Sequence, residues 1–138
     1  MNRLELRQLA EDRIADAAAL LAAGRWSGAY YMAGYAVECG LKACIAKLTI
    51  QDDFPRDRRF AEECYTHDLE RLLKSASLKP ALIAEIAVNT IFRNNWDVAV
   101  QWNEKSRYEQ KTQIQAQELY DAITNSPDGV LQWIRRYW

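Results

Sequence analysis

Residues 25–42 read RWSGAYYMAGYAVECGLK, and this stretch decides the fold. After Arg25 its only charged residues are Glu38 and Lys42, which stand four apart in the order that stabilises a helix. The other residues are mostly small or apolar, and a helix that is apolar on every side is buried over most of its circumference. The stretch therefore predicts the central helix of a bundle, interrupted by one charged pair.

The composition is that of an ordinary globular protein. The chain has 138 residues, of which 49% are hydrophobic and 27% charged, and its formal net charge is −1. This length is typical of one domain, so residues 1–138 are expected to form a single unit. The near-neutral charge lacks the basic excess that indicates nucleic-acid binding. Without a membrane-length apolar run or an apolar signal core, the sequence predicts a cytoplasmic protein with no membrane contact.

Apolar residues at spacings of three and four predict a first helix over residues 4–23. Gly24 follows it at the position of a left-handed cap, and Ser27 is the expected N-cap of the central helix at residues 28–48. The central helix carries a stripe of small residues, namely Ala29, Ala33, Ala36, Gly40 and Ala43. Because small side chains allow close approach, this stripe is expected to meet the first helix or a second copy of the chain.

The remaining sequence predicts shorter helices. Residues 51–64 mix charges with a proline and are expected to form a loop, after which Thr66 is the expected cap of a third helix. Pro80 begins a fourth helix that ends near residues 93–95. Residues 96–102 alternate in character and predict an extended segment. A fifth helix at 109–125 and a short C-terminal helix at 130–137 complete an all-α, up-and-down bundle of four to five main helices.

Cysteine and tryptophan are interpreted as structural residues. Cys39, Cys44 and Cys64 are an odd number without metal-ligand spacing, so buried thiols are expected, with no metal and no cofactor. The five tryptophans have no basic residues interleaved as a nucleic-acid surface would, and a core or dimer interface is expected, with the interface preferred. They are Trp26, Trp96, Trp102, Trp133 and Trp138.

Three motifs in order resemble the HEPN domain family. GRWSGAYYMAGYAVECGLKACI (residues 24–45) is followed by THDLERLL (66–73) and by SRYE (106–109) before a C-terminal helix. The resemblance covers residues 5–125. It implies a small all-α bundle, usually homodimeric, of prokaryotic toxin–antitoxin, nucleotidyltransferase-associated and defence systems.

Many members of this family are metal-independent endoribonucleases. They carry an arginine, four to six intervening residues and then a histidine, which suits a reaction that moves a proton beside a phosphate. The one histidine of this chain is His67, and the positions for its arginine hold Phe60, Ala61 and Glu62. No histidine follows Arg93 or Arg107 at this spacing either. The RNase motif is therefore missing.

Five residues form the candidate ligand-binding set: Glu38, Arg93, Asn94, Arg107 and Tyr108. Glu38 has two interpretations, a surface pair with Lys42 or an inward carboxylate that binds Arg93 or Arg107, and the second is preferred. His67 is interpreted as a helix-start residue that packs against the fourth helix and bonds to a nearby backbone group. A second subunit could instead bring an arginine to it.

Three functions stay open. The preferred one is a non-catalytic homodimeric binding or scaffold module, paired with a nucleotidyltransferase-type partner. The second is an RNase toxin with a divergent active site built from Arg93, Arg107, Glu38 and His67. The third is a nucleotide-binding bundle, since helical bundles hold ligands between their helices.

Overall fold

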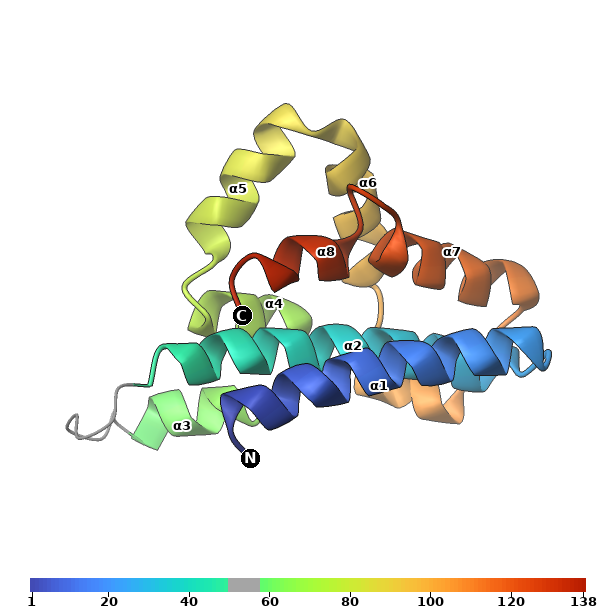
Figure 1. The fold of residues 1–138 in the computed structure, drawn as a ribbon, viewed down its shortest axis with the longest axis horizontal. Helices are drawn as coiled ribbons and strands as arrows, with labels where there is room; N and C mark the ends of the chain where they lie inside the picture. The colour runs from blue at the N-terminus through green and yellow to red at the C-terminus, as the bar shows by residue number, and fades with distance from the viewer. Residues whose placement is uncertain (50–57) are drawn as a thin grey trace.

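The fold is all-α, as predicted (Figure 1). The computed structural model describes residues 1–49 and 58–138, in which no strand occurs. The helices of these residues are α1 (Arg3–Ala22), α2 (Trp26–Lys47), α3 (Arg58–Cys64), α4 (Leu69–Ser75), α5 (Lys79–Val88), α6 (Thr90–Ala99), the 3-10 helix η1 (Glu104–Tyr108), α7 (Gln113–Thr124) and α8 (Val130–Arg135). None of them combines the length and apolar character that crossing a bilayer requires.

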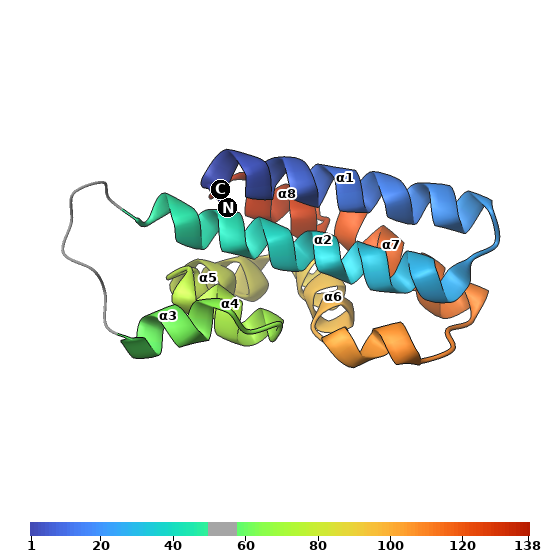
Figure 2. The ribbon, with the colours of Figure 1, turned by 90° about the horizontal axis from the view of Figure 1, so that it is seen from below.

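The two long helices form the spine of the molecule. α1 and α2 run side by side in opposite directions, with α7 and α8 packed on the pair (Figures 1 and 2). Gly24 has a φ of +71° in the turn between them, so the predicted left-handed cap is confirmed. The expected cap at Ser27 is wrong, because Ser27 lies in the first turn of α2. Its Oγ instead accepts a hydrogen bond from the backbone N–H of Lys111, 2.9 Å away.

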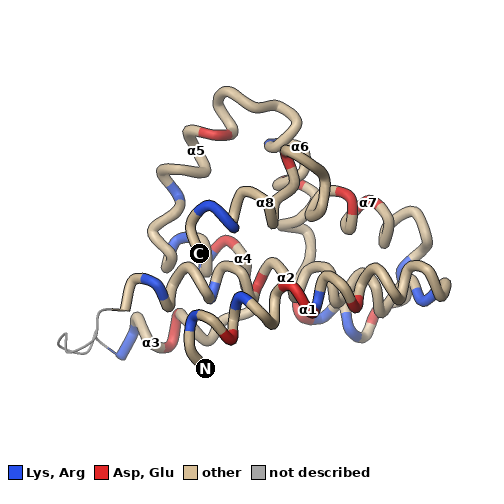
Figure 3. Tube along the Cα trace, in the orientation of Figure 1, with Lys and Arg blue, Asp and Glu red and all other residues tan. Residues whose placement is uncertain are grey.

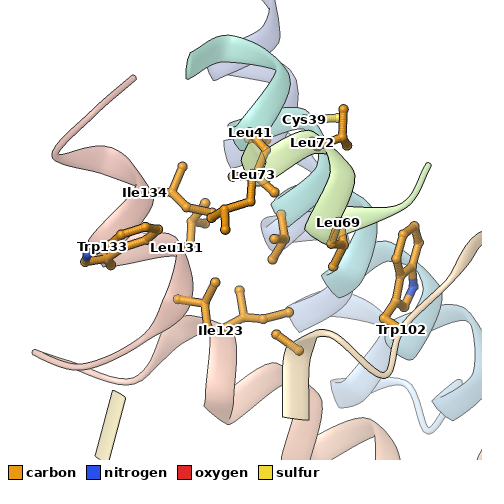
Figure 4. Close-up of a cluster of buried hydrophobic side chains, with 14 of the residues drawn as sticks. Cys39, Leu41, Leu69, Leu72, Leu73, Trp102, Ile123, Leu131, Trp133 and Ile134 are labelled. Carbon is orange, nitrogen blue, oxygen red and sulfur yellow. The ribbon is translucent and has the colours of Figure 1, made fainter. Parts of the chain in front are cut away.

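The prediction of a buried central helix is confirmed. Most of α2 is buried, and its residues join the core formed by α4, α7, α8 and Trp102 (Figure 4). The indole of Trp102 fills the place where a side chain on Gly34 would stand, because a Cβ there would lie 2.2 Å from the ring. Gly40 faces Ile134 of α8, so at this position the small stripe meets α8 rather than the first helix.

The predicted fourth helix is in fact two helices, α5 and α6, which meet at Asn89. The Asn89 side chain accepts a hydrogen bond from the backbone N–H of Phe92 and thereby caps α6. Its amide nitrogen donates to Glu85 at 3.0 Å and to Asp128 at 2.8 Å. The break is therefore stabilised by a contact with the turn before α8.

Several other boundaries differ from the predictions. Residues 96–99 belong to α6 and residues 100 and 101 to a turn, so the predicted extended segment is wrong. Residues 58–64 of the expected loop form α3, and its residues 51–57 lie outside the described residues. Asp68 rather than Thr66 caps α4, and α7 begins after its cap Thr112 rather than at residue 109.

The tryptophans belong to the core of the single chain. Trp96, Trp102, Trp133 and Trp138 are buried, and Trp26 is half-buried. The preference for tryptophans at an interface is therefore not supported, because the chain's own helices cover them.

A different part of the molecule exposes apolar side chains. Residues 79–99, which we call the α5–α6 arm, stand away from the α1–α2 pair (Figure 1). α5 packs mainly against α6 and buries only Leu82. Ile83, Val88 and Ile91 are 59%, 84% and 57% exposed.

The first turn of α1 lies beside Trp138. Arg3 in the first turn of α1 donates from Nη2 to the carbonyl oxygen of Trp138 at 2.5 Å. Arg135 of α8 binds both carboxylate oxygens of Glu11, at 2.9 and 2.7 Å. These contacts fasten α8 to α1.

Candidate functional site

The candidate site begins with Glu38, a carboxylate inside the apolar helix α2. Glu38 is 1% exposed, and burial of a charged group is costly unless partners compensate it. Its Oε1 accepts from Lys42 Nζ at 2.8 Å and lies 2.9 Å from His67 Nδ1. Its Oε2 is buried and has no hydrogen-bond partner among the described residues. Two nitrogens therefore lie within hydrogen-bond distance of one oxygen, whereas the other oxygen has no partner in the described part of the chain.

His67 connects three elements of the fold. It stands just before α4, and its Nδ1 faces Glu38 of α2. Its Nε2 lies 3.3 Å from Glu104 Oε2 of η1. An ionised carboxylate only accepts hydrogen bonds, so each of these oxygens suits a ring N–H. The imidazole is 47% exposed, yet both of its nitrogens face carboxylates.

A hollow of about 460 Å³ opens beside His67. Its charged lining residues include Asp68, Arg71, Glu104 and Lys105. The guanidinium of Arg71 lies 3.9 Å from the Asp68 carboxylate. Because the acidic residues Asp68, Glu70 and Glu104 line it together with Arg71 and Lys105, its described lining residues give no concentrated positive field for a phosphate.

The structure separates the residues of the predicted ligand-binding set. Glu38 points inward as preferred, but it pairs with Lys42 and His67 instead of with an arginine. Arg93 and Asn94 are exposed on α6. Arg107 is exposed on η1, where its guanidinium lies 4.8 Å from the centre of the Tyr108 ring. The pair with Lys42 is the other interpretation of Glu38. That interpretation places the pair at the surface, which is wrong because Glu38 is buried.

The interpretation of His67 is also corrected. Its side chain contacts two carboxylates rather than a backbone group. Arg59, the arginine nearest to the position that the RNase motif requires, pairs with Glu63 at 3.4 Å. Sequence reasoning missed Glu104, Arg71 and Lys105. Arg71 had a signal, because it follows His67 by four residues at the start of a helix. Glu104 had none, since only the folded chain brings η1 to α4.

The two cysteines of α2 are buried thiols, as expected, whereas the same expectation is wrong for Cys64 of α3, which is only half-buried. Burial raises the pKa of Cys39 to about 12, with the neighbouring Glu38 charge adding to the rise. Burial also raises the pKa of Cys44 to about 11. Thiols with such pKa values stay protonated near neutral pH and are poor nucleophiles. Within residues 1–49 and 58–138, no group of three His, Cys, Asp or Glu side chains is placed to hold a metal ion.

Comparison with known proteins adds one finding. The family model described as HEPN domain matches residues 4–137, which is nearly the whole chain. Comparisons with curated proteins and with solved structures gave no match.

Proposed function

Because this chain belongs to the HEPN domain family, we propose that it is a non-catalytic homodimeric binding module that does not itself cleave RNA. The observation that carries this proposal is the position of His67, whose two ring nitrogens face Glu38 and Glu104. A general acid–base catalyst must present a nitrogen to the reacting group. In this arrangement the imidazole instead joins α2, the start of α4 and η1.

The arginines support the same proposal. Arg93 and Arg107 stand on different elements, and Glu38 binds neither of them. Arg71, which lines the hollow beside His67, lies 3.9 Å from the carboxylate of Asp68. An arginine that faces a carboxylate is partly neutralised as a phosphate ligand.

Incubation of the purified chain with single-stranded RNA tests the catalytic half of the proposal. We expect no cleavage above that of a His67→Ala control. Cleavage that is lost in His67→Ala and in Arg71→Ala would instead establish an RNase with a divergent active site. A thermal-shift series with nucleotides addresses the third function, since a nucleotide that binds the folded state raises its melting temperature.

The homodimer is proposed to form through the α5–α6 arm. Its exposed apolar residues Ile83, Val88 and Ile91 are the kind that mark interaction surfaces. In a two-fold dimer each surface meets a copy of itself, so a face with few charges avoids like-charge repulsion. Between residues 80 and 92 the only charged residue is Glu85, whose Oε1 accepts from Asn89 (Figure 3). The arm therefore fits a second copy of this chain.

Light scattering coupled to size exclusion tests this interface. We expect a dimer for the unmodified chain and a monomer for the double variant Ile83→Asp, Val88→Asp. The matched control is Ile114→Asp on α7, where Ile114 is 70% exposed outside the arm, and it should remain a dimer. A dimer that survives the double substitution would place the interface elsewhere. A nucleotidyltransferase-type protein partner, implied by the family resemblance, is tested by co-purification with the same variants.

A further inference from the structure

A second hollow, of about 460 Å³, lies between α1, α2 and α3. Leu6 and Leu9 of α1 and Ile45 of α2 give it apolar walls. Glu38 and Lys42 line it as well. Its size falls in the range of small-molecule pockets, which are mostly apolar with a few placed polar groups.

The polar group that needs a partner in this hollow is the carboxylate of Glu38. Its Oε1 is shared by Lys42 and His67, whereas its buried Oε2 has no hydrogen-bond partner among the described residues. A buried acceptor that has lost water without gaining a donor lowers stability until a donor reaches it. Glu38 lines the hollow, so a donor bound there lies close to this carboxylate.

Two titratable side chains near Glu38 in the hollow, Tyr35 and Cys39, are neutral near pH 7. Burial raises the pKa of the Tyr35 phenol, and burial with the Glu38 charge raises the pKa of Cys39 to about 12. Among the described residues that line the hollow, Lys42 is the one charged side chain besides Glu38, and it already contacts Glu38. A cationic ligand would meet the ammonium of Lys42, and an anionic one would meet Glu38. A neutral ligand avoids both repulsions.

We propose that this hollow binds a small, neutral, mostly apolar molecule that donates one N–H or O–H hydrogen bond to Glu38 Oε2. The apolar body of the ligand covers Leu6, Leu9 and Ile45. Because the Cys39 thiol stays protonated near neutral pH, the proposed binding is reversible and involves no covalent step at Cys39. The proposal is independent of the dimer, because none of the lining residues belongs to the α5–α6 arm.

A matched pair of probes tests the hydrogen bond. Indole has an apolar ring with one N–H, and 1-methylindole has the same ring without the donor. We expect indole to raise the melting temperature and to bind roughly tenfold more tightly than 1-methylindole in a ligand-observed NMR titration, as loss of one hydrogen bond to a charged group implies. Equal affinities, or no binding of indole, overturn the proposal.

A matched pair of variants tests the location. Ala46 lines the hollow, so Ala46→Phe should fill it and abolish indole binding. Ala15 is exposed on α1 and lines none of the described hollows, so Ala15→Phe should bind as the unmodified chain does. Indole binding that survives Ala46→Phe contradicts the proposed location. The arm variant Ile83→Asp, Val88→Asp should bind indole unchanged, which separates this result from the outcome of the dimer test.

Discussion

α2 and α5 are both strongly apolar helices, yet the fold treats them differently. α2 buries thirteen of its 22 residues, including the charged Glu38, whereas α5 buries only Leu82 among its 10 residues. An apolar sequence indicates that a helix needs a covering surface. Within residues 1–49 and 58–138 no such surface covers α5, and its exposed apolar residues are therefore the ones proposed to meet a second copy of the chain.

Shortening one apolar side chain in each helix should give the largest difference in stability between α2 and α5. Leu41 of α2 is 0% exposed, and Leu41→Ala should lower the free energy of unfolding by about 2–5 kcal/mol, because it leaves a cavity. Ile83 of α5 is 59% exposed, and Ile83→Ala should change the stability of the dilute monomer by less than about 0.5 kcal/mol. Denaturant unfolding measures both. Equal losses would break the distinction between the two helices.

A smaller effect on stability is expected from neutralising one carboxylate in each helix, Glu38 in α2 and Glu85 in α5. Glu38→Gln removes the charge that Lys42 and His67 share, and should cost about 1–3 kcal/mol. The cost should lie at the low end of this range, because the side chains of Lys42 and His67 are both partly exposed to solvent. Glu85→Gln on the arm is the control and should cost only a few tenths of a kcal/mol. Denaturant unfolding at neutral pH compares them, and a larger loss for Glu85→Gln would show that the buried network is not stabilising.

The smallest effect is a dependence of stability on alkaline pH that arises in α2. The folded pKa of Cys39, about 12, lies above the ordinary thiol pKa of 9.0, so the unfolded chain loses this proton first. The thiol's contribution is therefore fully present below pH 9 and is lost as pH rises toward 12. Cys44, with a pKa of about 11, acts in the same direction.

Cys39→Ala should reduce the loss of stability between pH 8 and pH 10 by about 1 kcal/mol, as measured by denaturant unfolding at each pH. The arm, residues 79–99, contains neither cysteine nor tyrosine, so Ile83→Ala is the matched control and should leave this slope unchanged. An unchanged slope in Cys39→Ala would mean that its thiol ionises equally in both states.

The sequence predicts the spine of the fold well, because α1 and α2 are long and strongly patterned. It predicts the second half less well, because short helices depend on distant contacts. The break at Asn89 relies on Asp128, which is 39 residues away. In residues 96–102 a local alternation was misleading, since the buried residues Phe92, Trp96 and Ala99 follow the spacing of a helix.

The candidate site was predictable only in part. A charged residue in the middle of an apolar helix identified Glu38 as an inward carboxylate. Its pairing with His67 joins positions 29 residues apart and depends on how α4 packs on α2. The preferred arginine partners failed for the same reason, because the packing that exposes Arg93 and Arg107 leaves no local trace in the sequence.

The hydrogen bond from Arg3 to the carbonyl oxygen of Trp138 has a practical use. A fluorescent donor and acceptor attached at residues 1 and 138 would transfer energy efficiently in the folded chain and poorly in the unfolded one. Such a labelled chain would report, one molecule at a time, whether α8 stays in contact with α1 when the protein concentration is raised to favour the proposed dimer.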